Sequence, residues 1–451
     1  MLRNVFVFLI IIVGAYFAFH GPFYALLFYL WNAYFRPESW VWDPLIGQLN
    51  LSLTIGVYLI LVSFNAIQNF RWSRQVVFVA LFFLQSLVSL IFSEAPAWSQ
   101  LWWIEFAKVQ VVTLLITLLV NDRKKYRLTL VVIAYSLGLE TAKQGWAQLL
   151  LNPGATNNNT SPLLGDNNGV AVGMMMLIPV FVALNQTARH RWERYLHNFF
   201  IVGVLYRGIS TYSRGGFLAA GAMGLVLLWY SPKKIRMILS TVILAYTISL
   251  AMPQSFWDRM ETITASDDAR DSSSAGRLHF WTVAVRMANA KPFTGVGFNA
   301  FRRAFGRYDP QGEWGDDRAV HSAWFGVLAE MGYPGLILMV TIIVGGLGSA
   351  WRIGRKARGD PALLDFRSYA RAMQATLVAY VVGMTFLHGQ YSEMFWHFVG
   401  LGVALERSFQ LALQEQTEKA VVATPAAPPI GLRSRFHPAN QPAKRISSGA
   451  R

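Results

Sequence analysis

Long apolar runs constrain this 451-residue chain more than any other feature of its sequence. Many of them reach about 18–25 residues, enough to cross a hydrocarbon core of roughly 30 Å as a helix. Only 14% of the residues are charged, whereas soluble globular proteins carry about 25%. The sequence therefore predicts an all-α polytopic membrane protein, and it excludes a soluble enzyme, a secreted disulfide scaffold and an outer-membrane barrel. The runs are residues 5–19, 22–35, 49–67, 76–93, 100–120, 128–151, 168–186, 196–212, 216–230, 235–252, 321–350, 370–388 and 392–412.

Positive charge is concentrated in every second connection between these runs. The chain has 40 Lys and Arg against 24 Asp and Glu, a formal net charge of +16. Such connections face the cytoplasm by the positive-inside rule, where anionic lipid attracts them, so nucleic acid is the weaker explanation of the charge. The pattern predicts about 12 membrane helices, with residues 1–35 crossing once or twice. The basic connections are 71–74, 123–127, 189–194, 233–236 and 352–371.

The opposite connections should face the periplasm of a Gram-negative inner membrane, and one of them, 253–320, is long and hydrophilic. Loops longer than about 15 residues are usually functional or disordered. This one has amphipathic patterning, an expected helix at about 276–290 and many aromatic residues. We therefore expect a folded periplasmic lid.

The chain divides by composition into three parts. Residues 1–130 should form N-terminal membrane helices, and residues 131–412 a second membrane region that includes the loop 253–320. Residues 413–451 are rich in Ala, Pro, Ser, Lys and Arg, with little apolar surface to bury. They should form a disordered basic cytoplasmic tail.

Several cations occupy positions near the outer membrane face, where the positive-inside rule does not put them. Lys108, Lys143 and Arg207 lie within apolar helices, and Arg214 lies in the short turn Ser213-Arg214-Gly215-Gly216. Ionisable residues at membrane depth usually line a polar cavity. Cations that converge from separate helices would suit a pyrophosphate.

A purely structural role is also open for the two lysines. Glu105 and Glu140 precede Lys108 and Lys143 by three residues, a spacing at which helical side chains can neutralise each other. Arg214 is the stronger candidate for a ligand site, because its neighbouring glycines allow a substrate to approach the backbone closely.

A histidine marks the point where the long loop enters a membrane helix, in Val320-His321-Ser322-Ala323-Trp324. A neutral imidazole can accept a proton near pH 7, as a general base must, although a histidine at a helix start can also be a satisfied polar residue. Glu330 follows half a helical turn out of phase with His321. It is expected first to pack or hydrogen-bond, and only secondarily to take part in catalysis.

Further arginines lie within the long loop. Arg277 is near the start of the expected helix, where a helix N-terminus and an arginine together favour an anion. Arg302 and Arg303 follow in Phe301-Arg302-Arg303-Ala304, and some of these side chains should pair with the loop's acids or face solvent. Asp166 is most simply a helix N-cap, with a contact to substrate as the alternative.

Nucleotide and metal signatures are missing from the sequence. There is no Walker A motif and no cysteine, so ATP and Cys-ligated metals are not expected. Asp267-Asp268 and Asp316-Asp317 are only weak metal candidates. We expect no cofactor and no metal.

Taken in order, Ser213-Arg214-Gly215-Gly216, Ala275-Gly276-Arg277 and His321-Ser322-Ala323-Trp324-Phe325-Gly326-Val327-Leu328-Ala329-Glu330-Met331-Gly332 resemble the bacterial O-antigen ligase superfamily. The resemblance covers residues 160–410. Residues 1–130, with Trp31-Asn32-Ala33-Tyr34-Phe35-Arg36-Pro37, resemble the N-terminal region of exosortase-associated O-glycosylation ligases.

The resemblance implies an inverting, metal-independent glycosyltransferase that transfers a glycan from undecaprenyl pyrophosphate to an acceptor hydroxyl at the periplasmic face. The acceptor would be lipid A-core oligosaccharide or a similar molecule. Arg214 and Arg277 match the family's pyrophosphate-holding arginines, and His321 matches its proposed base. The alternatives are an O-antigen or exopolysaccharide polymerase, a protein O-oligosaccharyltransferase of the same superfamily and, from another class, a transporter of lipid-linked sugar.

Overall fold

A computed structural model describes residues 2–41, 44–68, 70, 72–251, 254, 257, 272–310, 312 and 314–423. The described residues are predominantly helical and contain no strand, and the isolated β-bridge between Ser161 and Gly165 is their sole extended pairing. Each apolar run of the sequence overlaps a helix, and the run 49–67 is divided between two. The expected all-α class is therefore confirmed for this part of the chain.

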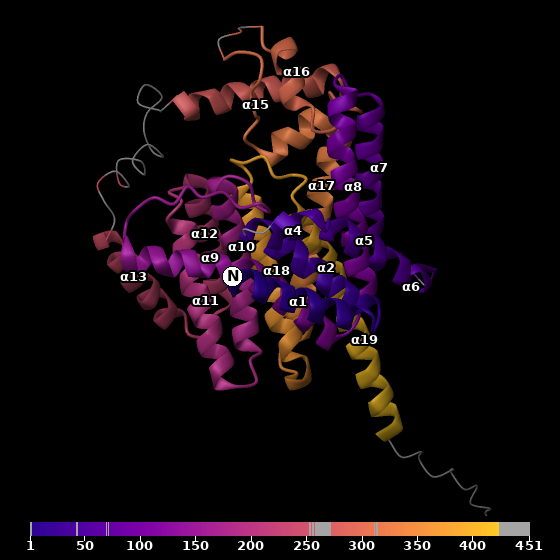
Figure 1. The fold of residues 1–451 in the computed structure, drawn as a ribbon, viewed down its shortest axis with the longest axis vertical. Helices are drawn as coiled ribbons and strands as arrows, with labels where there is room; N and C mark the ends of the chain where they lie inside the picture. The colour runs from indigo at the N-terminus through magenta and orange to yellow at the C-terminus, as the bar shows by residue number, and fades with distance from the viewer. Residues whose placement is uncertain are drawn as a thin grey trace, which may run out of the picture. The chain divides into compact units, whose positions relative to one another are not determined.

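The N-terminal 68 residues form a set of short helices (Figure 1). Residues 2–35 make two helices, α1 and α2, separated by a turn, and ring contacts such as Phe17–Tyr24 join them. A side chain in place of Gly14 would collide with Phe28, which shows how closely α1 and α2 pack. These elements are α1 (Leu2–Ala18), α2 (Pro22–Phe35), α3 (Pro37–Trp40), α4 (Pro44–Gln48), α5 (Leu51–Val62) and α6 (Phe64–Gln68).

The remaining helices are longer, and many begin at a recognisable cap. Ser73, Asp122, Asp166 and Ser213 each accept a hydrogen bond from a backbone N–H of the first helical turn, which satisfies a donor that has no partner within the helix. The helices are α7 (Arg74–Ile91), α8 (Pro96–Leu119), α9 (Arg123–Leu151), α10 (Asn167–Gln186), α11 (Arg191–Ile209), α12 (Arg214–Tyr230), α13 (Lys234–Ala251), α15 (Ser272–Ala290), α16 (Phe301–Tyr308), α17 (Ala323–Lys356), α18 (Leu364–Gly383) and α19 (Glu393–Ala423), with a 3-10 turn at Pro361–Leu363.

Helix α10 lies at the centre of the bundle. It is buried over most of its length and packs against α9, α11, α12 and α18. Small residues permit the close packing: a Cβ at Gly383 of α18 would lie 2.5 Å from the Val172 side chain of α10. Thr376 Oγ1 donates to the carbonyl of Met176 at 2.9 Å across the same interface.

Four described helices are long and apolar enough to cross a membrane, namely α7, α8, α10 and α17, and shorter apolar helices are α1, α5 and α12. The predicted number of about 12 crossings remains a prediction. Contacts do gather several predicted cytoplasmic connections at one end of the bundle. Arg127 pairs with Glu193 at 2.6 Å, Arg123 pairs with Asp365 at 3.9 Å, and the guanidinium of Arg371 lies over the Tyr230 ring.

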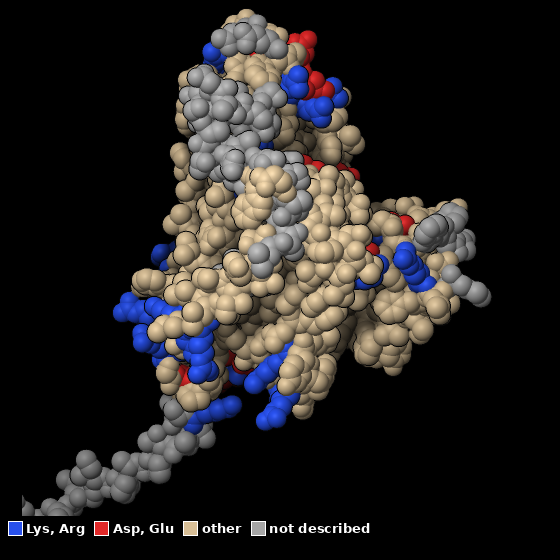
Figure 2. Space-filling view, turned by 90° about the vertical axis from the view of Figure 1, so that its left-hand side faces the viewer, with Lys and Arg blue, Asp and Glu red and all other residues tan. Residues whose placement is uncertain are grey.

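Figure 2 shows the same arrangement on one face of the molecule. Lys and Arg gather at the end that carries these connections, a second mixed group of charges lies at the opposite end, and a third mixed group lies at mid-height on the right-hand side, while the rest of the surface between the ends is mostly uncharged. A mostly uncharged surface between two charged ends is what a membrane-embedded helical protein presents to lipid.

Helix α17 is broken at the point where it approaches the long loop. Gly332 has φ 68° and ψ −171°, and Pro334 follows it. The break frees backbone groups that partners then satisfy, because Tyr333 N–H donates to the Pro292 carbonyl and Gln85 Nε2 donates to the Met331 carbonyl, each at 2.9 Å. A Cβ at Gly332 would lie 2.4 Å from the Pro292 oxygen, so glycine is required here.

The described part of the long loop is folded, as the sequence predicts. Helix α15 lies across one end of the bundle, with α16 beside it (Figure 1). The helix expected at about 276–290 starts earlier, at Ser272. A core of its own, which includes Phe280, Met287 and Phe305, stabilises the segment. At the other terminus, α19 continues to Ala423, and residues 424–451 of the expected tail lie outside the described residues.

Candidate functional site

Three helix N-termini meet beside the C-terminal end of α18. A Cβ at Gly216 of α12 would lie 2.5 Å from the Cβ of Ala171 in α10, so these two helices touch in their first turns. The Ala323 N–H of α17 donates to the Met384 carbonyl at 2.9 Å, just after α18 ends. Helix N-termini carry partial positive charge and unpaired N–H groups. This end of the bundle is therefore suited to an anion.

His321 lies at this junction in a strained backbone conformation. Its φ is +47°, a left-handed value that costs a residue with a side chain about 1–2 kcal/mol. Hydrogen bonds on either side fix it: Trp281 Nε1 donates to the Val320 carbonyl at 3.1 Å, and Trp324 Nε1 donates to Thr385 Oγ1 at 3.1 Å. Residues held in this way are concentrated at functional sites.

The surroundings of His321 keep its imidazole neutral. Burial is the largest influence, and the positive charges of His388 and Arg277 add to it, while Asp166 opposes them; together they lower the pKa of His321 to about 4. A neutral imidazole can accept a proton. An anion bound nearby would raise the pKa of His321 and make it a stronger base.

The two arginines expected to hold a pyrophosphate flank this region. Arg277 lies on α15 within electrostatic reach of His321 and is half-buried. Arg214 is the first residue of α12, also half-buried, and follows Tyr212, whose φ of +53° is left-handed as well. A Cβ built on the next residue, Gly215, would lie 3.6 Å from the carbonyl oxygen of Gly383. The start of α12 therefore lies against the end of α18.

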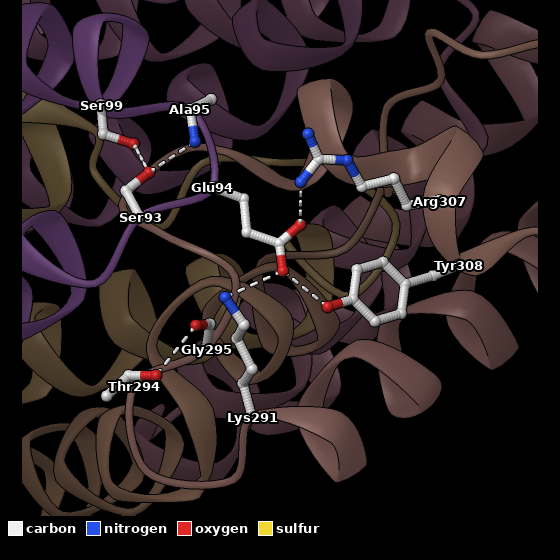
Figure 3. A network of polar contacts seen from close by, with 9 residues as sticks. All are labelled: Ser93, Glu94, Ala95, Ser99, Lys291, Thr294, Gly295, Arg307 and Tyr308. Carbon is white, nitrogen blue, oxygen red and sulfur yellow. Dashed lines mark hydrogen bonds and ion pairs between the residues drawn. The ribbon is translucent and has the colours of Figure 1, made fainter.

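Glu94 ties α15 and α16 to the hairpin formed by α7 and α8 (Figure 3). Its carboxylate accepts hydrogen bonds from Tyr308 Oη at 2.6 Å and from Arg307 Nη1 at 3.1 Å, and it pairs with Lys291 Nζ at 2.9 Å. Burial alone would raise the pKa of Glu94, but the bonds from Tyr308 and Lys291 and the charges of Lys291 and Arg307 lower it. The carboxylate is ionised at neutral pH and anchors the segment that carries Arg277.

Backbone contacts strengthen the same interface. Glu94 N–H donates to the Val296 carbonyl at 2.9 Å, and Trp98 Nε1 donates to the Asn299 carbonyl at 2.9 Å. Ser89 Oγ donates to the Glu330 carbonyl at 2.6 Å. The α7–α8 hairpin, the loop after α15 and the broken part of α17 are therefore held as one unit.

Glu330 is a hydrogen-bonding residue in the structure, which was its first interpretation from sequence. Its buried carboxylate accepts from Gln390 Nε2 at 3.0 Å, Tyr391 Oη at 2.9 Å and the Phe301 N–H at 3.3 Å. It therefore connects α17 with the first residue of α16 and with the segment between α18 and α19.

The other predicted cations have structural partners. Lys108 pairs with Glu105 and Lys143 with Glu140, each at 2.6 Å and at the i,i+3 spacing. Arg207 is buried and donates to Gln144 and to the carbonyls of Asn157 and Asn159, so it holds the loop that precedes α10. These contacts match the structural alternative for the two lysines.

The arginines of α16 also have partners. Arg302 pairs with Asp317, and the guanidinium of Arg303 stacks over the Trp98 ring at 4.4 Å from its centre. Arg302 is in addition within electrostatic reach of His388.

Sequence reasoning missed His388 and Glu94. His388 is exposed and its ring centre is 5.9 Å from that of His321. The sequence does show that the apolar run 370–388 ends in a histidine. Nothing in the sequence indicates that this histidine lies beside His321. Glu94 stands in a short turn between two apolar runs, and its partners follow about 200 residues later.

The part of the chain that the structure describes contains no group of three or more His, Asp or Glu side chains that could hold a metal ion. Of the two weak candidates from sequence, Asp317 is paired with Arg302, and Asp267-Asp268 lies outside the described residues.

Residues 199–340 match the family model described as O-antigen ligase. This stretch is therefore similar to O-antigen ligases. The match supports the O-antigen ligase resemblance noted from the sequence over residues 199–340, and it contains Arg214, Arg277 and His321. A comparison with curated protein sequences gives no match. The O-antigen ligase match supports a membrane glycan enzyme of the ligase or polymerase type that works on a lipid-linked glycan donor in a membrane.

Proposed function

We propose that this protein transfers a glycan from undecaprenyl pyrophosphate to an acceptor hydroxyl at the periplasmic face of a bacterial inner membrane, without a metal. The acceptor we favour is lipid A-core oligosaccharide. One observation carries the proposal. Within the stretch that matches the O-antigen ligase model, the neutral imidazole of His321, which precedes α17, lies within electrostatic reach of Arg277 on α15.

The proposed reaction is a single displacement at the anomeric carbon. His321 takes the proton of the acceptor hydroxyl while the acceptor oxygen attacks, and the bond from the anomeric carbon to the pyrophosphate oxygen breaks. The leaving pyrophosphate takes that electron pair, and attack from the opposite face inverts the anomeric centre. The donor already has a good leaving group, so the protein has mainly to position the reactants and stabilise departing charge.

Arg214, Arg277 and the helix N-termini are the groups proposed to receive that charge. Both arginines can donate two parallel hydrogen bonds to phosphate oxygens, which a lysine cannot. Lys108, Lys143 and Arg207 would contribute less, because each is engaged in the contacts described above. The strained backbone at His321 would hold the base in place before the acceptor arrives.

The glycans of a deletion strain test this function. A ligase defect should leave free lipid-linked polymer in the membrane and remove that polymer from its acceptor, and wild-type protein but not His321→Ala should reverse both changes. Accumulation of single lipid-linked repeat units would instead indicate a polymerase. Unchanged surface glycan with unchanged lipid-linked intermediates would contradict the proposal.

A further inference from the structure

The segment Trp31–Pro37 takes no part in the proposed chemistry, yet two of its side chains, Tyr34 and Arg36, contact α19. Arg36 ends α2 in a left-handed conformation, with φ 52°, and donates from Nη2 to Glu393 Oε2 at 2.8 Å. The two side chains are 28% and 14% exposed, so water screens the pair only partly. Glu105 of α8, which is itself paired with Lys108, is also within electrostatic reach of Glu393, and Arg36 offsets this repulsion.

A second contact from the same segment reaches the next turn of α19. The Tyr34 hydroxyl and His397 Nδ1 are 3.3 Å apart, and both residues are buried. Glu393 and His397 are four residues apart and so lie on one face of α19. The end of α2 therefore holds the start of α19 at two successive turns.

The start of α19 directly follows residues 384–392, which carry His388. Trp396 Nε1 donates to the Gln390 carbonyl at 3.0 Å, and Tyr380 Oη donates to the Gly389 carbonyl at 3.1 Å. Glu330 fixes the other side of the segment through Gln390 and Tyr391. The segment is thus bound on one side to the helix that follows His321 and on the other to the N-terminal helices.

We propose that the Arg36–Glu393 ion pair is a positioning element of the active site, which fixes residues 384–392 and thereby sets His388 beside His321. The inference rests on the proposed function, because it takes His321 as the base. It gives the N-terminal helices a role in the reaction: they hold α19 in register with α17, so that the two imidazoles keep their separation of 5.9 Å.

The chain offers a matched control for this pair. Arg127 and Glu193 form an ion pair of 2.6 Å with side chains 24% and 14% exposed, and they join α9 to α11 at the opposite end of the bundle. Arg127→Gln therefore removes a pair of similar geometry and burial without touching residues 384–392. Any effect common to both variants reflects loss of a partly buried ion pair and nothing more.

The test uses purified full-length protein in lipid, a polyprenyl-pyrophosphate-linked glycan and a hydroxyl acceptor. Arg36→Gln should lower kcat roughly 10-fold or more and change the donor KM less than about 2-fold, because the pair acts on the reacting groups and not on donor binding. Arg36→Lys should restore most of kcat, since the ion pair can form again. Arg127→Gln should leave kcat unchanged.

The pH profile supplies a readout that loss of stability would not move. The charged and titratable groups that face His321 are His388 from residues 384–392, Arg277 from α15 and Asp166 at the start of α10. Withdrawal of His388 removes a positive neighbour and raises the pKa of His321, so the acid limb of kcat/KM in Arg36→Gln should move to higher pH. Arg127→Gln should keep the wild-type limb.

Equal behaviour of Arg36→Gln and Arg127→Gln in kcat and in the acid limb would overturn the inference. If Arg36→Gln is not recovered folded, Glu393→Gln replaces it, with the same expected effects and the same contradicting result. His321→Gln in the same assay separates the two claims. Absence of transfer by the wild-type protein refutes the proposed function, and full transfer by His321→Gln refutes the role of His321 as base. Loss of transfer by His321→Gln with normal transfer by the Arg36 and Glu393 variants refutes the positioning role alone.

Discussion

The imidazole rings of His321 and His388 lie 5.9 Å apart, centre to centre, with an angle of 71° between their planes. His321 precedes α17 and His388 follows α18, so the pairing exists only because α17 packs against α18 and the Ala323 N–H bonds the Met384 carbonyl. Because His388 helps to lower the pKa of His321, the pair affects the pH range in which His321 can act as a base.

Transfer should persist well below the pH at which an ordinary histidine is protonated. Burial and the charges of His388 and Arg277 lower the pKa of His321 to about 4 in the free protein, whereas an unperturbed histidine would titrate near 6.5. The active form is neutral, so kcat/KM should fall only as the pH drops through about 4. A pyrophosphate bound beside His321 should raise its pKa. The acid limb of the kcat profile should therefore lie at higher pH than the acid limb of the kcat/KM profile. Acid limbs of kcat and kcat/KM that both lie near 6.5 would show that burial, His388 and Arg277 do not lower the pKa of the base.

The arginines should matter through their geometry as well as their charge. Arg277→Ala and Arg214→Ala should each abolish transfer while the protein stays in the membrane at its normal level. Arg277→Lys and Arg214→Lys should rescue poorly, because lysine offers a point charge in place of a planar pair of donors. Transfer assays with Arg286→Ala, an exposed arginine on the same helix as Arg277, give the control, which should be near wild type. Nearly full activity in both lysine variants would exclude bidentate binding.

Glu94 should stabilise the protein in a pH-dependent way. Glu94→Gln loses charge-assisted bonds to Lys291, Arg307 and Tyr308 and should cost about 1–3 kcal/mol of unfolding free energy at pH 7. Because folding lowers the pKa of Glu94, this contribution is present above the unfolded value near 4.5 and is lost as the pH falls through the folded value.

Thermal unfolding of purified variants across pH measures this effect. The difference between wild type and Glu94→Gln should shrink below about pH 4.5. Glu105→Gln, which breaks an exposed pair, should change stability by less than about 1 kcal/mol. A Glu94→Gln protein as stable as wild type at pH 7 would show that the α15–α16 segment is held by other contacts.

The orientation of the site is a separate prediction. A reporter that is active only in the periplasm should work when fused near Asp309 and fail near Lys234 or Arg358, since the basic connections should be cytoplasmic. Activity at Arg358 with silence at Asp309 would place the site on the cytoplasmic face.

Much of the fold could be predicted from local signals, because apolar runs and caps act over a few residues. Asp166 was predicted to cap a helix, and it caps α10, whereas Ser213 was assigned to a turn and caps α12. Of the candidate site residues, Arg277 and His321 were named from the sequence and lie within electrostatic reach of each other, and their roles stay predictions. The contacts of Glu94, His388 and Arg36 could not be predicted, because each depends on helices distant in the chain. The ion pairs of Lys108 and Lys143 are local, at the i,i+3 spacing, and the sequence offered them as one of two alternatives.

Transfer by a purified His321→Gln variant tests the central claim most directly. Glutamine keeps a hydrogen-bonding group of similar reach but cannot take up a proton. With lipid-linked donor, hydroxyl acceptor and a chelator present, wild type should form the glycosylated acceptor. His321→Gln should be slower by about 10²–10⁴-fold with donor binding retained. Transfer by His321→Gln at close to the wild-type rate would contradict the claim that His321 is the base.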